Sequence, residues 1–412
     1  MESAALLALS NPLLTVAIYL VAVATSTLLV RYNSTIHSLV SSSATSTRCH
    51  ALDGLRGYLA VGVFASHVAI TWMYITQGKW MFPKSHFYTL LGEVCVTLFF
   101  MMTGFLFWTK LIEFQSRSSR LNGYWQNFII GRVWRIYPLY FFMLGVIIVI
   151  VFALQNWKSQ EPLLTTIIQC LRWLTFSMTD INQVPDTGLF IAFVAWSLRY
   201  EWLFYLVFLV SLLVVSKTHR DWVALVIGII LVTLIIYFDP TTRFYAKHCV
   251  SFLGGVIASY SVRHQPIKSF IRHPAMNGVA FCALLYVLFF LPSATSPAAF
   301  VLLTLFFTII AAGNMLLGVL RPQSVLWLGE ISYSIYLLHG LILWFVGQYV
   351  FTKLTFGTVQ PAVFIAMSLV IVVCIVLLCS LTHLVIERPG IEMGKRIINS
   401  LRKNKTSSSL KP

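Results

Sequence analysis

Long apolar segments recur along this chain at close to the length that an α-helix needs to cross a lipid bilayer. A helix rises about 1.5 Å per residue, so about 20 apolar residues span roughly 30 Å of hydrocarbon. The chain has 412 residues, of which 58% are hydrophobic and 10% are charged. An average soluble chain carries about 25% charged residues, because its surface faces water. We therefore predict an all-α fold, a polytopic transmembrane helix bundle.

The pattern predicts about eleven spans. They cover residues 12–30, 57–77, 89–109, 136–154, 194–215, 222–238, 245–262, 275–292, 298–318, 331–351 and 361–386. The first span has Glu2 and no basic residue before it, which is the wrong flank for a signal peptide. Residues 163–178 are apolar but short and contain Arg172, so we interpret them as an interfacial or re-entrant segment.

Basic residues concentrate in alternate loops, as the positive-inside rule describes. If residues 31–56 are cytoplasmic, most of the 29 lysines and arginines fall on that side. This predicts an outside N-terminus and a cytoplasmic C-terminus, in a cytoplasmic (inner) or plasma membrane. Topology and anionic lipid also explain the formal net charge of +16, so we predict no nucleic-acid partner.

The chain is predicted to form a single membrane domain, residues 1–390, and a basic cytoplasmic tail, residues 391–412, whose end from 403 we expect to be disordered. Residues 40–47 are rich in Ser, Thr and Ala and indicate a flexible linker. Glu387-Arg388-Pro389 is typical of a helix stop and anchor. The seven cysteines are scattered without a Cys-x-x-Cys pair, which predicts neither a disulfide framework nor a metal site.

Ionisable side chains at membrane depth are costly, about 2.5–3.5 kcal/mol for Arg, Lys or Asp, so they usually line functional cavities. Asp53 and Arg56 lie in a Leu-Asp-Gly-Leu-Arg-Gly run at the inner mouth of the second span, and His67 follows eleven positions after Arg56. Eleven residues return to nearly the same helix face about 16 Å further along. Arg56 as a snorkelling anchor and His67 as a packing residue are the structural alternatives.

Arg132 and Arg135 precede a Tyr-Pro pair and are three residues apart, so on a helix they point the same way. Two forked guanidinium groups at the cytoplasmic mouth suit a phosphorylated ligand. An interfacial anchor is the alternative.

Glu201 belongs to a Trp-Ser-Leu-Arg-Tyr-Glu run in the fifth span, which enters from outside, so it is expected in the outer half of the membrane. There it requires a partner on another helix, a proton or a wet cavity. His339 closes the run Gly-Glu-Ile-Ser-Tyr-Ser-Ile-Tyr-Leu-Leu-His and is expected near mid-depth, where packing is the alternative role.

Taken together, these motifs resemble the acyltransferase-3 family of membrane acyltransferases in their order and spacing. The resemblance covers residues 52–339, with compatible hydropathy to about residue 390. Arg56 and His67 resemble the family's Arg-x10-His signature, and Arg132 and Arg135 its arginine pair. The sequence does not continue into the soluble hydrolase-like domain that some members carry, so we expect any such partner to be a separate protein.

The resemblance implies transfer of an acyl group, usually acetyl from acetyl-CoA, to a hydroxyl of a glycan or other acceptor, often across the membrane. It assigns the catalytic role to His67 with Arg56, and the CoA nucleotide to Arg132 and Arg135. Glu201 and His339 match family positions of less settled role. The acceptor stays open between an envelope glycan, such as a lipopolysaccharide or exopolysaccharide sugar, and a small metabolite.

The mechanism expected from this pattern places the CoA nucleotide near the arginines and the thioester near His67. Neutral His67 would act as general base, with a transient acyl-His as the alternative. Glu201 would orient His67, hold the acceptor or relay a proton. A secondary transporter or flippase for an anionic or sugar substrate, which also requires intramembrane His, Glu and Arg, is the rival function. A non-catalytic scaffold is the third.

Overall fold

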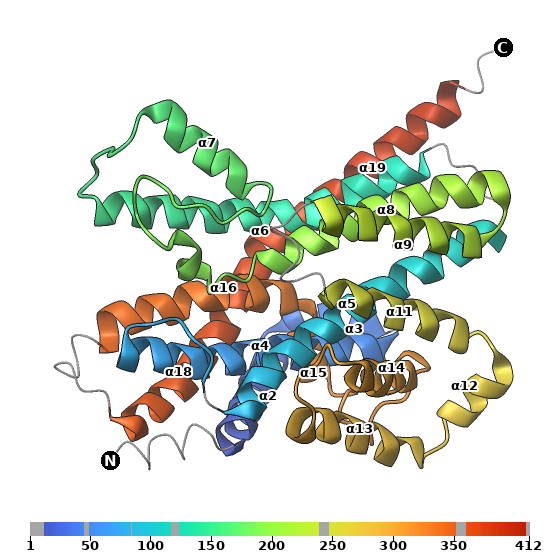
Figure 1. Cartoon of the computed structure of the whole chain (residues 1–412), viewed down its shortest axis with the longest axis horizontal. Helices are drawn as coiled ribbons and strands as arrows, with labels where there is room; N and C mark the ends of the chain where they lie inside the picture. The colour runs from blue at the N-terminus through green and yellow to red at the C-terminus, as the bar shows by residue number, and fades with distance from the viewer. Residues whose placement is uncertain are drawn as a thin grey trace.

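The computed structural model describes residues 12–44, 49–83, 85–116, 123–238, 247–351 and 360–408, and within them the chain is helical with no strand. Figure 1 shows the helices crossing in one body, with α19 leading to the C-terminus at its edge. The bounds of the longer helices are α2 Leu13–Tyr32, α4 His50–Gln77, α5 His86–Ser116, α6 Tyr124–Leu154, α8 Trp196–Thr218, α9 Asp221–Phe238, α16 Ser332–Phe345, α18 Pro361–Thr382 and α19 Arg388–Ser408. The shorter ones are α3 Ser34–Ala44, α7 Leu163–Trp173, η1 Thr187–Ile191, η3 Lys247–Cys249, α11 Val250–Ser261, α12 Gln265–Ile271, α13 Met276–Phe290, α14 Pro297–Ala311, α15 Gln323–Glu330, and the π-helical turns η4 Val346–Phe351 and η5 His383–Glu387.

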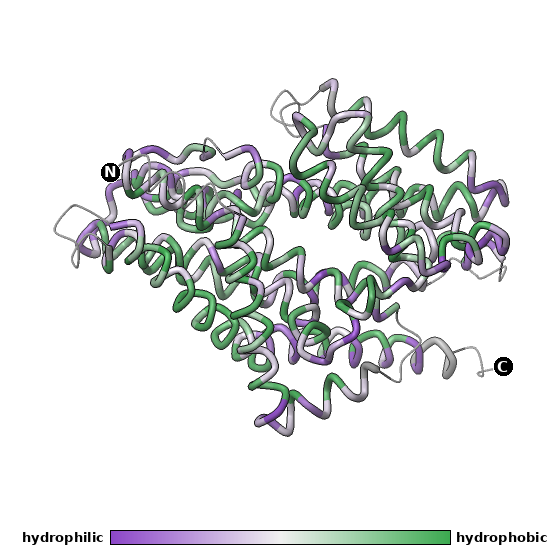
Figure 2. Tube along the Cα trace, turned by 90° about the horizontal axis from the view of Figure 1, so that it is seen from below, coloured by the Kyte–Doolittle hydropathy of each residue, from purple (hydrophilic) through white to green (hydrophobic). Residues whose placement is uncertain are grey.

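The all-α, multi-pass character predicted from the sequence is confirmed. Seven described helices are long and apolar enough to cross a membrane, or eight when α12 and α13, bent by 77°, form one broken span. Figure 2 shows hydrophobic residues along most helices, with hydrophilic residues gathered at many of their ends.

The predicted count of eleven spans is not confirmed. Three of the expected segments, residues 222–238, 245–262 and 298–318, correspond to α9, α11 and α14. Helices α11 and α14, of 12 and 15 residues, are too short for a full crossing, whereas α9 has 18 residues. The orientation of the chain in the membrane stays a prediction.

Helices α4 and α5 form the centre of the bundle. Of the most apolar window of each, 78% and 72% is buried inside the protein, against 39% for α2, α6 and the α18–α19 helix. Helix α4 packs on α5, α15 and α16, while α5 also packs on α11 and α8. A helix that is apolar all round belongs in the interior of a bundle. The Arg-x10-His helix is therefore the central one.

Small residues allow α4 to approach α15 closely. A Cβ atom at Gly57 would collide with backbone atoms of Val325 and Gly329, and a Cβ atom at Gly329 would collide with the backbone of Asp53. Close packing through glycines is common between membrane helices, because lipid provides no hydrophobic drive for their association. The Asp-Gly-Leu-Arg-Gly motif thus fixes where α4 sits as well as supplying charges.

Three predictions about connections are wrong. Residues 40–44 of the expected linker belong to helix α3, and residues 45–47 lie outside the described part. Glu387-Arg388-Pro389 does not end the last helix, because the π turn η5 joins α18 to α19 in one helical segment. The tail expected to be disordered from residue 403 stays helical to Ser408, and residues 409–412 lie outside the described part.

Residues 163–173, expected to be interfacial or re-entrant, form the short amphipathic helix α7. Its apolar side chains Leu163, Leu164, Ile167 and Leu171 are exposed on the protein surface. A short helix with one exposed apolar face is typical of a segment that lies in the membrane interface. Its length is too small for a crossing.

Candidate functional site

Two histidines that are far apart in the sequence meet in the centre of the bundle. The Nδ1 atom of His67 on α4 lies 3.2 Å from the Nε2 atom of His339 on α16, and the ring centroids are 4.9 Å apart. His339 is fully buried, while His67 is partly exposed. The packing of α16 against α4 therefore brings two sequence-predicted residues into one pair.

Backbone contacts define which nitrogen carries the proton in each ring. The Nδ1 atom of His67 lies 3.0 Å from the carbonyl oxygen of Val63, and that of His339 lies 2.9 Å from the carbonyl oxygen of Ile335. A carbonyl oxygen only accepts hydrogen bonds, so in both neutral rings Nδ1 is the protonated nitrogen. The single Nδ1–H group of His67 is then shared between the carbonyl oxygen of Val63 and Nε2 of His339, which leaves the lone pair of His67 on Nε2.

Arg56 sits on α4 two turns after its start and pairs with Asp53. The Nη1 atom of Arg56 lies 3.2 Å from Oδ1 of Asp53, and both side chains are largely buried. The Nε–H group of Arg56 points at the sulfur atom of Met102, 2.9 Å away. Asp53 thus acts on Arg56 as a counter-ion one turn away on the same helix.

Arg132 and Arg135 lie within α6, which begins at Tyr124, twelve residues earlier than the predicted span. The guanidinium group of Arg132 is 5.3 Å from the ring centre of Phe107 and 5.9 Å from that of Tyr205, within cation–π range. Arg56, Lys110, Arg132 and Arg135 lie close enough for their charges to act on one another. We call these four residues the cationic cluster.

Glu201 lies beside the cationic cluster, and its expected depth in the outer half of the membrane stays a prediction. Its Oε1 atom accepts a hydrogen bond from the hydroxyl group of Tyr205, and its charge acts favourably on Arg135. Tyr205 also lies beneath Arg132. The carboxylate therefore balances part of the positive charge that α6 brings to this region.

The motifs of α8 and α16 are joined by a buried hydrogen bond. The Oγ atom of Ser197 lies 2.7 Å from the hydroxyl oxygen of Tyr336, three residues before His339. The rings of Tyr336 and His339 are in edge contact, with centroids 6.3 Å apart. This contact connects the run that contains Glu201 to the helix that carries His339.

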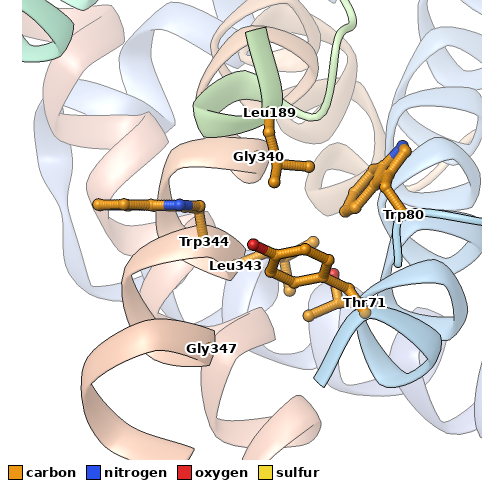
Figure 3. A pocket seen from close by; sticks show the side chains of 8 residues that line it. Thr71, Trp80, Leu189, Gly340, Leu343, Trp344 and Gly347 are labelled. Atoms are coloured by element: carbon orange, nitrogen blue, oxygen red, sulfur yellow. The ribbon is translucent and has the colours of Figure 1, made fainter. Parts of the chain in front are cut away.

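A small pocket opens beside the histidine pair, on the side away from Arg56. It is lined by Thr71, Tyr74, Trp80, Leu189, Gly340, Leu343, Trp344 and Gly347. Figure 3 shows Trp80 and Trp344 on opposite walls. The ring of Trp80 stacks on His67, with centroids 6.0 Å apart and planes inclined by 24°.

Gly340, the neighbour of His339, lines this pocket and allows α16 to pack closely against the turn that follows η1. A Cβ atom at Gly340 would collide with the backbone of Ile191 and Ala192. Ala192 and Phe193 both have positive φ, 52° and 56°, a conformation that non-glycine residues rarely adopt. Phe193 contacts Trp80, and the ring of Trp80 stacks on His67. This strained turn therefore helps to position the aromatic ring beside the histidine pair.

Sequence reasoning missed Trp80, Tyr205 and Tyr336 as parts of the site. Tyr205 was within reach, because it follows Glu201 by four residues and so lies on the same helix face. Tyr336 precedes His339 by three residues and was equally within reach. Trp80 lies between helices, where no periodic pattern indicates its direction.

No group of three or more potential metal-ligating His, Cys, Asp or Glu side chains occurs in the described ranges. All seven cysteines are described and free.

Comparison with known proteins identifies the family. The family model for an acyltransferase domain, acyltransferase 3, matches residues 50–380. Neither the curated proteins nor the solved structures include a match to this chain. The matched range contains the histidine pair, the cationic cluster and Glu201, and it covers well over half of the sequence. The chain is a multi-pass membrane protein that belongs to the acyltransferase-3 family.

Proposed function

We propose that this protein transfers an acetyl group from acetyl-CoA to a hydroxyl group of a glycan or other acceptor, in a cytoplasmic or plasma membrane. The observation that carries the proposal is the 3.2 Å contact between His67 Nδ1 and His339 Nε2. It leaves a neutral imidazole nitrogen, His67 Nε2, free to take a proton at a partly exposed position in a membrane helix bundle.

In the proposed reaction, His67 Nε2 removes the proton of the acceptor hydroxyl as its oxygen attacks the thioester carbonyl carbon. The tetrahedral intermediate collapses with cleavage of the C–S bond. The proton held on His67 passes to the leaving sulfur, so CoA departs as the free thiol and the acetyl ester remains on the acceptor. His339 Nε2 stabilises the imidazolium through the Nδ1–H group of His67.

An acyl-His route predicts different kinetics. There His67 Nε2 attacks the thioester directly and CoA leaves before the acceptor arrives. Stoichiometric release of CoA without acceptor favours that route. Its absence, with both substrates needed for any CoA release, favours direct transfer.

The cationic cluster supports a site for the nucleotide of CoA. Arginine and lysine side chains bind phosphate groups, and the cluster combines four of them. Among the described residues, the buried indole N–H group of Trp202 has no hydrogen-bond partner. Its ring packs on Tyr205, which lies beneath Arg132. An unpaired buried donor is costly, so a bound anionic group that accepts from it fits this region.

The pocket on the other side of the histidine pair supports a glycan acceptor. Thr71 lies four residues beyond His67 along α4, whereas Arg56 lies eleven residues before it. Donor nucleotide and acceptor would therefore approach His67 from opposite ends of α4. The aromatic walls Trp80 and Trp344 offer flat apolar faces, and Tyr74 and Thr71 bring hydroxyl groups. This combination suits contact with the face and edge of a sugar ring at the mouth of the pocket, because the pocket itself has room for only about one water molecule.

Purified protein and radiolabelled acetyl-CoA test the proposal. We expect acetyl transfer to an acceptor with wild type and a loss of about 10²–10⁴-fold in kcat with His67→Ala. Arg132→Ala should weaken the affinity for acetyl-CoA. His264→Ala, an exposed histidine before α12, is the matched control and should behave as wild type. Near-normal turnover of the His67 variant rules out its assigned role, and unchanged acetyl-CoA affinity of the Arg132 variant rules out the nucleotide site.

Family membership does not favour the transporter or flippase that the sequence left open. Substrate flux in sealed vesicles without consumption of acetyl-CoA would favour the transporter or flippase over the acyltransferase.

A further inference from the structure

Glu387 is a buried carboxylate to which the proposed mechanism assigns no role. It ends the π-helical turn η5 between α18 and α19, and it is 1% exposed. Single π turns inside long helices are rare and often mark functional positions. A buried carboxylate is costly unless hydrogen bonds and positive charge surround it. The partners of Glu387 therefore indicate why it is there.

Two of these partners come from η5 and α16. The Oε2 atom of Glu387 accepts a hydrogen bond of 3.0 Å from the hydroxyl group of Ser334, five residues before His339. The same oxygen lies 3.1 Å from Nδ1 of His383, although that nitrogen is not in hydrogen-bonding geometry. Glu387 thus ties the turn to the helix that carries the buried histidine.

The third neighbour is the arginine helix α6, which packs against both η5 and α19. A Cβ atom at Gly390, three residues after Glu387, would collide with the ring of Pro138 and meet the carbonyl oxygen of Trp134. These two residues flank Arg135 on α6. The hydroxyl group of Tyr333, beside Ser334, donates to the carbonyl oxygen of Ile136 at 2.9 Å. The backbone around Arg135 is thus held from both sides by the neighbours of Glu387.

We propose that Glu387 is a positioning residue that holds the α6 segment carrying Arg135 in place for binding the phosphate groups of the donor nucleotide. This inference rests on the proposed use of acetyl-CoA. The carboxylate charges of Glu387, Glu330 and Glu201 all favour the cationic form of Arg135. A binding segment that is already held in place loses less conformational freedom when a phosphate group binds. Because Ser334 and His339 share α16, the same carboxylate also fixes the arginine helix relative to the histidine pair.

The test compares donors with and without the nucleotide. In Glu387→Gln the side chain keeps its shape and loses its charge. We expect the KM for acetyl-CoA to rise about tenfold, as for loss of one interaction with a charged group, with little change in kcat. With S-acetylpantetheine, which has the thioester arm but no nucleotide, kinetics should match wild type. Glu392→Gln, on the exposed face of α19 in an ion pair with Arg388, is the matched control.

A double-mutant cycle separates positioning from general destabilisation. Arg135→Gln should raise the KM for acetyl-CoA at least as much as Glu387→Gln, and the double variant should be no worse than Arg135→Gln alone. Independent, additive effects overturn the proposal. So does an acetyl-CoA KM within about twofold of wild type in Glu387→Gln, or an equal loss with both donors.

Two further measurements keep the result interpretable. If Glu387→Gln does not fold, Glu387→Asp keeps the charge but withdraws it by one methylene, and it should show the same donor-selective rise in KM. Direct binding of CoA to the purified proteins separates the two proposals. Wild type that does not bind CoA contradicts the proposed function, whereas equal CoA binding by wild type and Glu387→Gln contradicts the role of Glu387 alone.

Discussion

His67 and His339 are separated by 272 positions in the sequence, yet His67 Nδ1 and His339 Nε2 are 3.2 Å apart. Helix α4 supplies one ring and helix α16 the other. Each ring is also held by a carbonyl group one turn earlier on its own helix. The pair therefore has a fixed direction, with the acceptor nitrogen of His339 behind the base and His67 Nε2 in front.

The first prediction concerns this direction. His339→Gln keeps an amide oxygen that accepts from His67 Nδ1–H, whereas His339→Leu removes the acceptor. We expect kcat to fall about 10- to 100-fold in His339→Leu and clearly less in His339→Gln, with unchanged KM for acetyl-CoA in both. Steady-state kinetics on purified variants measure this. Equal losses in the two variants would show that His339 only fills space.

The second prediction concerns the ring beneath Arg132. Tyr205→Phe removes the hydroxyl group that donates to Glu201 but keeps the aromatic face, and Tyr205→Leu removes both. We expect the KM for acetyl-CoA to rise about threefold to tenfold in Tyr205→Phe and a further two- to fivefold in Tyr205→Leu, since an aromatic face contributes about 0.5–1 kcal/mol to a cation. Identical values for the two variants would contradict a cation–π contribution.

The third prediction concerns Trp80, which stacks on His67 and lines the pocket. Trp80→Ala should raise the KM for the acceptor about threefold to tenfold, because it removes an aromatic face worth about 0.5–1.5 kcal/mol. The KM for acetyl-CoA should stay unchanged. Trp222→Ala, which removes a tryptophan that is 57% exposed, is the control. A shift in the donor KM alone would place the pocket on the donor side.

The fourth prediction concerns stability. Gly57→Ala forces a methyl group into backbone atoms of α15, whereas Gly145→Ala on α6 places it in open space. We expect Gly57→Ala to destabilise the fold by about 1–3 kcal/mol through overpacking. Gly145→Ala should be neutral or stabilising by about 0.5–1 kcal/mol, because alanine favours the helix. Thermal unfolding in detergent measures both, and equal Tm values for the two variants would contradict close α4–α15 packing.

Local features of the sequence were enough to predict the helices and part of the site. Apolar length indicated membrane helices, because only a helix satisfies its own backbone groups in hydrocarbon. The eleven-residue spacing correctly placed Arg56 and His67 on one helix, α4, and the motif order pointed to the family. These properties depend on residues close in sequence, or on their order.

The number of crossings was harder to predict, because hydropathy does not show where a helix breaks. The segments at residues 245–262 and 298–318 are apolar enough for a span, but the helices within them, α11 and α14, have only 12 and 15 residues. The interpretation of Glu387-Arg388-Pro389 as a helix stop was wrong for a related reason, since the sequence does not show where a helix continues through a π turn. A proline in a helical sequence usually ends or kinks the helix, but here the π turn η5 just before Pro389 allows the helix to continue.

The sequence by itself determined that this chain forms helices of membrane-spanning length and apolarity that carry a few histidine, arginine and glutamate residues. Only the tertiary structure decided that His67 meets His339, that Glu201 lies beside the cationic cluster, and that Glu387 is buried against Ser334 of α16. The reason is physical. Membrane helices have similar apolar surfaces, so hydropathy does not select which faces pair. The pairing comes from close packing at residues such as Gly57, Gly329 and Gly390 and from buried polar contacts between helices.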